Sequence, residues 1–306
     1  MRIGFGAPVS GSWATPENLA HVARRAEQLG YHSLWTFQRL LSPVDGSWGE
    51  TYRSVLDPLA PLAYAAALTS RIRLGVAVVN LPFGSPVVLA KQLATMDILS
   101  AGRLDTGLGN GWSDAEFTAT GASMRRQGQR ADEFIELLTR LWSDDEVAHQ
   151  GAFYQVPRMR MDPKPVQRPR PPVLLGGGVD PALRRAGRLC DGWVSSSRAD
   201  LRTIGASVAV VRGAAERAGR DPAGLRFVCR GAVRIRPAGS PQRAPLVGTP
   251  DQIRSDFDDL AGQGITELFV DLNFDPQIGS PDADPAESLR RADEALAAFA
   301  PEPAGG

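Results

Sequence analysis

The chain has 306 residues, of which 43% are hydrophobic and 22% are charged, a composition typical of a globular protein. Its 34 basic and 34 acidic residues cancel, so bulk attraction to nucleic acid or to a membrane is not expected. No apolar run reaches the roughly 20 residues that cross a bilayer, and the start, MRIGFGAPVSG, is typical of a strand rather than a signal peptide. We therefore expect a soluble, cytoplasmic protein.

Cysteine and histidine are too scarce and too scattered to predict a metal site. Cys190 and Cys229 form no CxxC pair, and we expect both to be buried, reduced thiols. The three histidines, His21, His32 and His149, lack the spacing of metal ligands.

Eight short runs rich in apolar and β-branched residues predict parallel strands covered by helices. The predicted strands are Arg2–Val9, His32–Phe37, Ile72–Val79, Arg103–Leu108, Pro172–Leu175, Gly192–Ser196, Leu225–Ile235 and Glu267–Leu272. The first predicted helix begins after Thr15 and ends at Gly30, and the others are Leu56–Leu68, Val87–Leu99, Ala131–Trp142, Pro181–Leu189, Leu201–Ala218, Pro250–Ala261 and Ala286–Phe299. This alternation predicts a single α/β domain, a (β/α)₈ TIM barrel over residues 1–306. A doubly wound open sheet is the alternative, although it normally has fewer strands.

Two segments fall outside this alternation. Residues 143–171 are irregular and rich in proline, and they are too long for a simple connection. We expect them to form a structured excursion between the fourth and fifth strands, near the barrel mouth. Residues 301–306, PEPAGG, are expected to be a flexible tail.

The stretch from Arg71 to Trp112 predicts a strand, a helix that begins at Ser85–Pro86, and a second strand. The first strand ends in Asn80, and the second runs into Gly109-Asn110-Gly111. The carboxyl ends of barrel strands meet at one mouth, where ligands bind. Asn80, Asn110 and Gly111 are therefore candidate ligand contacts.

Three glycines, Gly176, Gly177 and Gly178, follow the fifth predicted strand, and Pro181 opens a helix just behind them. Amide groups at such a helix start can bind a phosphate without any lysine. A plain tight turn explains the same pattern.

Other candidates lie at the ends of the first, second and fourth strands. Gln38 and Arg39 follow the second strand and could donate hydrogen bonds at the mouth, although a surface arginine is the simpler interpretation. Trp13 and Trp112 could form walls of a substrate pocket for a flat ligand, or could serve only in packing.

Several segments, taken in order, resemble one known family. They are RRAEQLGYHSLWTFQRL, the Arg71–Trp112 stretch, RADEFIELLTRLW, GAFYQVPRMRMDPKPVQRPRPPVLLGGG, AGRLCDGWV and VGTPDQIRSDFDDLAGQGITELFVD. Together they are similar to the luciferase-like flavin- and deazaflavin-dependent oxidoreductases, a superfamily of (β/α)₈ barrels. The resemblance covers nearly the whole chain.

The resemblance implies specific roles. It implies a bulge in the third strand with a non-prolyl cis peptide near Ala77–Val78, behind the central ring of a flavin or deazaflavin. It implies that Asn110 and Gly111 contact the cofactor, and that Gly176–Gly178 bind its phosphate. Members of the family are commonly homo-oligomers.

The chain also departs from the family pattern. Many relatives end the second strand with an acidic residue and a histidine, where this chain has Gln38 and Arg39. Sugar-phosphate dehydrogenases of the family have a glutamate where Trp112 stands. These departures argue against alcohol oxidation by a histidine base. The mechanism that is left is hydride transfer in which Gln38 and Arg39 stabilise the negative charge that develops. These two are the candidate catalytic residues.

These observations predict an oxidoreductase that transfers a hydride between coenzyme F420 and an unidentified small organic substrate. The arginine-rich composition, typical of actinobacteria, and the segments GFGAPVSG and SLWTFQRL favour F420. One alternative is an FMN-dependent monooxygenase that uses O₂ and reduced flavin supplied by a partner reductase. A second alternative is a non-catalytic flavin-binding barrel.

Overall fold

A computed structural model describes residues 1–239 and 243–302, and at its centre is a closed barrel of eight parallel strands. The barrel strands are β1 (Arg2–Gly6), β2 (Ser33–Thr36), β3 (Arg73–Asn80), β4 (Leu104–Gly109), β7 (Val173–Gly176), β8 (Gly192–Val194), β9 (Arg226–Ala232) and β12 (Glu267–Asp271). Around the barrel they follow the order β1-β12-β9-β8-β7-β4-β3-β2. The predicted (β/α)₈ barrel is confirmed, and each predicted strand overlaps an observed one.

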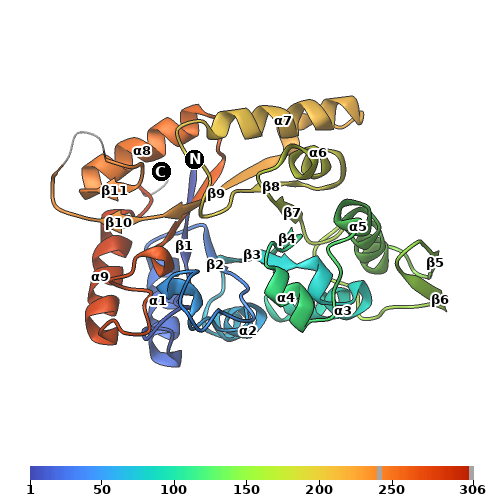
Figure 1. Ribbon diagram of the computed structural model, residues 1–306, viewed down its shortest axis with the longest axis horizontal. Coiled ribbons are helices and arrows are strands. Elements are labelled where there is room, and N and C mark those ends of the chain that lie inside the picture. The colour runs from blue at the N-terminus through green and yellow to red at the C-terminus, as the bar shows by residue number, and fades with distance from the viewer. Residues whose placement is uncertain (240–242, 303–306) are drawn as a thin grey trace.

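A ring of helices surrounds these strands (Figure 1). The long helices are α1 (Pro16–Gln28), α2 (Leu59–Leu68), α3 (Pro86–Leu99), α5 (Gln127–Ser143), α6 (Asp180–Leu189), α7 (Ile204–Arg217), α8 (Pro250–Gly262) and α9 (Pro285–Ala298). Thr15 and Ser85 accept backbone hydrogen bonds at the starts of α1 and α3, as expected of their side chains. The predicted helix ends are correct to within a few residues.

The sequence did not predict the smaller elements. A short helix, α4 (Asp114–Ala119), follows β4 at the carboxyl end of the barrel. Two small sheets are formed by β5 (Val147–Gln150) with β6 (Gln155–Met159), and by β10 (Arg234–Ile235) with β11 (Val247–Gly248).

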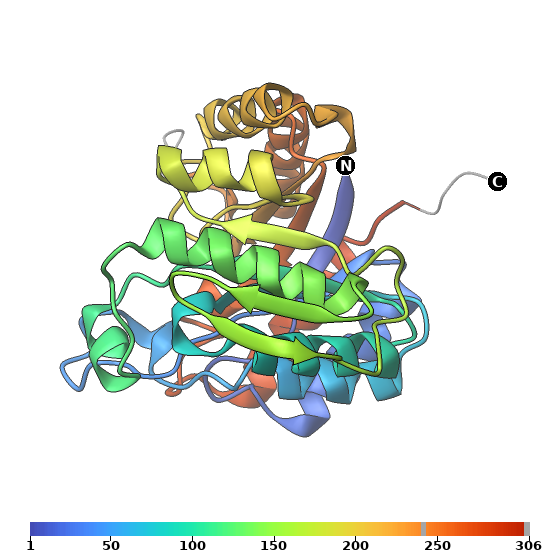
Figure 2. The ribbon, with the colours of Figure 1, turned by 90° about the vertical axis from the view of Figure 1, so that its right-hand side faces the viewer.

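The expected place of the 143–171 excursion at the barrel mouth is wrong. Its hairpin, β5–β6, lies on the outer side of α5 (Figure 2), where Glu133 accepts hydrogen bonds from the backbone N–H groups of Phe153 and Tyr154. The rest of the segment crosses the opposite end of the barrel, where Asp97 accepts hydrogen bonds from the N–H groups of Val166 and Gln167. The carboxylates of α3 and α5 thus direct this segment away from the mouth.

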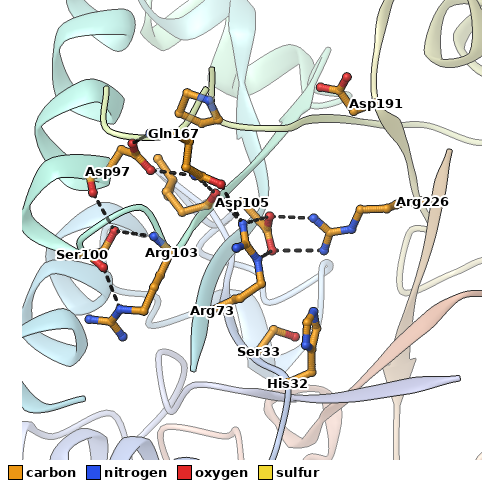
Figure 3. Close-up of polar contacts among 12 residues, drawn as sticks. His32, Ser33, Arg73, Asp97, Ser100, Arg103, Asp105, Gln167, Asp191 and Arg226 are labelled. Carbon is orange, nitrogen blue, oxygen red and sulfur yellow. Dashed lines mark hydrogen bonds and ion pairs between the residues drawn. The ribbon is translucent and has the colours of Figure 1, made fainter. Parts of the chain in front are cut away.

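A network of charged side chains closes the amino-terminal end of the barrel (Figure 3). The buried carboxylate of Asp105 accepts hydrogen bonds from Arg73 at 2.7 and 2.9 Å. It also accepts two from Arg226 at 2.6 and 3.0 Å, and Arg226 donates a further one to Glu267 at 2.7 Å. Each carboxylate and guanidinium group of this network thus has a partner among the described residues.

Apolar side chains fill the middle of the barrel. The rings of Trp35 and Phe269 stack with centroids 5.2 Å apart, and Leu174, Val194 and Val228 pack with them. With the amino-terminal end closed and the middle filled, a ligand can enter the barrel only from its carboxyl end.

None of the described helices is long and apolar enough to cross a membrane. Of the predicted flexible tail at 301–306, residues 303–306 lie outside the described part of the chain.

Candidate functional site

A cavity of about 440 Å³ opens at the carboxyl ends of the barrel strands. It is lined by Phe37, Gln38, Arg39, Tyr52, Ala77, Val78, Asn80, Gly109, Asn110, Gly111, Trp112, Gln127, Gly176, Gly177, Gly178, Val179, Ala182, Val194, Ser195, Ser196, Ser197, Arg198 and Arg230. Every candidate residue from the sequence lines this cavity, with one exception. Its volume falls in the usual range for small-molecule sites.

The exception is Trp13, which was expected to line a substrate pocket. Its side chain is buried in the hydrophobic core, not in the cavity wall. The segment after β1 turns away from the mouth because the side chain of Asn273 accepts hydrogen bonds from the N–H groups of Val9 and Ser10. The N–H group of Ser12 then donates to the carbonyl of Ser280, so Trp13 follows into the core.

One wall of the cavity is formed by a bulge in β3. The peptide bond between Ala77 and Val78 is cis, at the place that the family resemblance implied. Two residues of β3 here face one residue of β4, since the register shifts between Val76 and Val79. The bulge therefore directs the Val78 side chain toward the cavity.

Two glycines make room for Val78. A Cβ atom on Gly109 would lie 2.4 Å from Val78 Cγ2, and one on Gly176 would lie 2.9 Å from Val78 Cγ1. Both distances are shorter than real carbon contacts. Glycine at these strand ends thus permits the bulge and keeps the adjacent wall flat, as a ring system would require.

Some polar atoms of the lining are buried without a partner. The Oδ1 atom of Asn110 and the Nε2 atom of Gln127 make no hydrogen bond among the described residues. Such unpaired groups are uncommon in folded proteins, and a bound ligand is one way to satisfy them. Asn110 and Gln127 therefore fit a polar ligand between β4 and the start of α5.

Gln38 is held in place by the bulged strand. Its side-chain Oε1 accepts a hydrogen bond of 2.8 Å from the backbone N–H of Asn80. This bond fixes the orientation of the amide group and leaves Nε2 as its donor atom.

Arg39 forms a buried ion pair that the sequence did not reveal. Its Nη1 donates to Glu116 Oε2 at 2.5 Å, and Glu116 also accepts hydrogen bonds from the N–H groups of Leu40 and Leu41. The motif from Ser113 to Glu116 resembles a capping box, and Ser113 does cap α4. The Glu116 side chain, however, reaches across to Arg39.

Aromatic rings surround the Arg39 guanidinium. Its central carbon lies 4.7 Å from the ring of Trp112, 4.8 Å from that of Tyr52 and 5.2 Å from that of Trp48. Trp48 and Trp112 also contact each other, with centroids 4.9 Å apart. Trp112 thus lies at the rim of the cavity, while Tyr52 and Trp48 come from the long segment after β2.

Arg230, on β9, also lines the cavity and was not singled out from the sequence. Its Nε lies 3.0 Å from Asp271 Oδ2, yet neither Nε nor Nη2 makes a hydrogen bond to a described residue. The alternation in RFVCRGA could have predicted this position. Phe227 and Cys229 face outward, so Val228 and Arg230 face the inside of the barrel.

The two cysteines are free and buried, as expected. Burial raises the pKa of both the Cys190 and the Cys229 thiol to about 12. Cys229 lies behind Ser195, whose hydroxyl is 3.8 Å from its sulfur. Both thiols remain protonated at neutral pH and are not candidate nucleophiles. Among the described residues, no group of three or more His, Cys, Asp or Glu side chains is arranged to hold a metal ion.

Comparison with known proteins matches residues 3–244 to the luciferase-like monooxygenase family. An uncharacterized protein of Mycobacterium tuberculosis is 34% identical over 210 residues, which are 65% of this chain and 73% of the relative. The crystal structure of monooxygenase RslO1 from Streptomyces bottropensis is 25% identical, with a TM-score of 0.80 over 98% of both chains. The coenzyme F420 dependent tetrahydromethanopterin reductase from Methanopyrus kandleri, at 17% identity and a TM-score of 0.75 over 98% of both chains, shares the fold.

Proposed function

The chain belongs to the luciferase-like monooxygenase family, and from this premise we propose that it is an oxidoreductase dependent on coenzyme F420. In this proposal a hydride moves between the deazaflavin and a small organic substrate, both bound in the cavity at the barrel mouth. When bound, the deazaflavin supplies the hydride-transfer chemistry, and the protein supplies orientation and electrostatics.

The observation that carries the proposal is the wall formed by Ala77 and Val78. In the bulge of β3 the Val78 side chain lies between Gly109 and Gly176, where neither neighbour has a Cβ atom to obstruct a planar ring. The buried and unpaired Oδ1 of Asn110 lies in the same lining. A flat apolar surface with a free polar group at its edge fits the tricyclic ring of a flavin or deazaflavin.

The other end of the cavity fits a phosphate group. Gly177, Gly178 and Val179 precede the first turn of α6 and line the cavity. Backbone N–H groups at a helix start favour an anion.

Gln38 and Arg39 remain the proposed catalytic residues on the substrate side. The hydrogen bond from the Asn80 N–H to Gln38 Oε1 leaves the Gln38 amide able to donate to an oxygen of the substrate. Such a donor stabilises negative charge that develops on that oxygen during hydride transfer.

F420 is favoured by the arginine-rich composition, in which Lys91 and Lys164 are the only lysines, and by the segments GFGAPVSG and SLWTFQRL. The second candidate is an FMN-dependent monooxygenase that receives reduced flavin from a reductase. The similarity to monooxygenase RslO1, at 25% identity over 98% of both chains, supports this alternative.

The experiment is a pair of anaerobic titrations, one with oxidised F420 and one with FMN, monitored by cofactor fluorescence. The proposal expects saturable quenching of F420 at micromolar protein and no tight binding of FMN. Tight FMN binding without F420 binding would contradict it and favour the monooxygenase. Binding without turnover on a broad substrate panel would favour a non-catalytic barrel.

A further inference from the structure

We propose that Arg230 determines substrate specificity by binding the carboxylate of a planar aromatic acid in this cavity. The identification of that acid as the substrate rests on the proposed function. The anion site itself rests only on the residues around Arg230.

The charge of the cavity lining is the first argument. Its ionisable residues of constant charge are Arg39, Arg198 and Arg230, and no Asp or Glu side chain belongs to the described lining. A cavity whose charged groups all have one sign attracts a ligand of the opposite sign. The charged groups that face a ligand here are therefore cationic donors, and the carboxylates of Glu116 and Asp271 lie behind two of them.

The hydrogen bonding of Arg230 is the second argument. About 8% of the residue is exposed, and its Nη2 is buried without a partner among the described residues. Asp271 is the ion-pair partner of Arg230. Its Oδ1 already accepts hydrogen bonds from the backbone N–H and the side-chain Nδ2 of Asn273. Arg226, on the same strand, shows the contrast, since it donates to both Asp105 and Glu267. Arg230 thus has guanidinium N–H groups that can donate hydrogen bonds to a ligand.

The geometry of a guanidinium group suits a carboxylate in particular. Its terminal N–H groups form a planar fork that can donate two parallel hydrogen bonds to the two oxygens of a carboxylate. Burial strengthens such bonds, because little water competes for the donors.

The other two arginines are less suited to this role. Arg39 uses a terminal nitrogen, Nη1, to donate to Glu116, whereas Arg230 approaches Asp271 only through Nε. Arg198 is exposed, and its guanidinium lies 5.5 Å from the ring of Trp112 at the rim. An anion there would remain largely in contact with water, which weakens its interaction.

The apolar surroundings of Arg230 point to an aromatic acid. Its guanidinium carbon lies 4.7 Å from the ring of Phe37 and 5.0 Å from that of Phe274. Phe37 and Tyr52, with centroids 6.4 Å apart, both line the cavity next to this cation. A flat ring can pack against these aromatic faces while its carboxylate reaches Arg230.

The test compares the binding of 2-naphthoate with that of its neutral analogue 2-naphthamide by isothermal titration calorimetry. The full chain is used with and without F420. We expect the wild-type protein to bind the naphthoate about tenfold more tightly than the amide. Equal affinities for the two probes would overturn the proposal.

Two variants test whether Arg230 causes the preference for naphthoate over naphthamide. Arg230→Met keeps a long side chain between the aromatic rings but removes the charge, and it should reduce the preference to less than about twofold. R230M/D271N removes both charges of the pair, so that no buried carboxylate is left alone, and should give the same result. The control is Arg212→Met, whose guanidinium lies 5.1 Å from the ring of Phe227 but does not line the cavity. It should keep the full preference.

Circular dichroism establishes that each variant is folded before its affinity is compared. A preference that survives in the folded double variant would overturn the proposal. So would a variant that loses affinity for F420 but keeps the preference for naphthoate, since Arg230 would then serve the cofactor. Binding of naphthoate through Arg230 without any binding of F420 or FMN would support the anion site while contradicting the proposed function.

Discussion

Arg39 and Glu116 form a buried ion pair across the rim of the cavity, with 2.5 Å between Nη1 and Oε2 and with 6% and 1% of their side chains exposed. The pair joins the segment after β2 to the short helix α4. It compensates the charge of Arg39, whose guanidinium contacts the rings of Tyr52 and Trp112. The rim is therefore held together by one charge pair within a cluster of aromatic rings.

The first prediction concerns this pair. Glu116→Gln keeps the shape of the side chain but leaves Arg39 as a buried charge without a partner. We expect the free energy of unfolding to fall by about 3 kcal/mol, as is usual when one member of a buried pair is removed. Urea unfolding measures this change. Glu287→Gln, which removes an exposed partner of Arg290 and Arg291, is the control and should have a much smaller effect.

The second prediction concerns the space beside the cis peptide. In Gly109→Ala the new methyl group would lie 2.4 Å from Val78 Cγ2, so the bulge must move. We expect a loss of about 1–3 kcal/mol in stability, together with weaker cofactor binding. Thermal unfolding and the F420 titration measure the two effects.

A matched glycine provides the control for this substitution. A Cβ atom on Gly262, at the end of α8, would meet no atom within 4 Å. Gly262→Ala should therefore keep both the stability and the affinity for F420. An unchanged affinity in Gly109→Ala would show that the ring does not lie against Val78.

The third prediction concerns the amino-terminal end of the barrel. Burial raises the pKa of Asp105, but the hydrogen bonds from Arg73 and the charge of Arg226 outweigh it, so the pKa lies below its usual value. A carboxyl group whose pKa is lowered by folding stabilises the protein above the unfolded-state pKa of about 3.9, and this contribution disappears as the pH falls through the folded-state pKa.

Asp105→Asn should therefore lower the free energy of unfolding at pH 7. Below about pH 4 this free energy should fall less steeply with decreasing pH than in the wild type. Urea unfolding measured at intervals between pH 7 and pH 2 tests this. Asp258→Asn, at an exposed position of α8, is the control and should leave the pH dependence as in the wild type. An equally steep acid dependence in Asp105→Asn would be evidence against the role of this network.

The fourth prediction concerns Cys190 and Cys229. Both thiols are completely buried, and burial raises the pKa of each to about 12. The native protein should therefore not react with a thiol-specific disulfide reagent at pH 8, while two thiols should react after unfolding in guanidinium. Fast labelling of the native protein would mean that one of these side chains becomes exposed.

Much of the fold could be predicted because the pattern is local. Strands such as Ile72–Val79 are runs of apolar residues, and helix starts such as Ser85–Pro86 depend on neighbouring residues alone. The ends of these elements define the mouth, so Gln38 and Asn110 were found as residues that line the cavity. The place of the cis peptide at Ala77–Val78 came from the family resemblance.

The features that could not be predicted depend on contacts between distant parts of the chain. Glu116 pairs with Arg39, which lies 77 positions away, and nothing in the sequence around either residue indicates the other. Asn273 holds the segment after β1, and this long-range contact sends Trp13 into the core. The 143–171 segment follows Glu133 and Asp97, whose partners are likewise set by the tertiary structure.

The most direct test of the proposed cofactor site is a crystal structure of the protein grown with saturating F420. We predict that the deazaflavin ring lies against Val78, with Asn110 at its edge and its phosphate at Gly177–Gly178. Electron density for the ring elsewhere in the barrel mouth, or an empty cavity at a concentration that saturates binding in solution, would contradict this prediction.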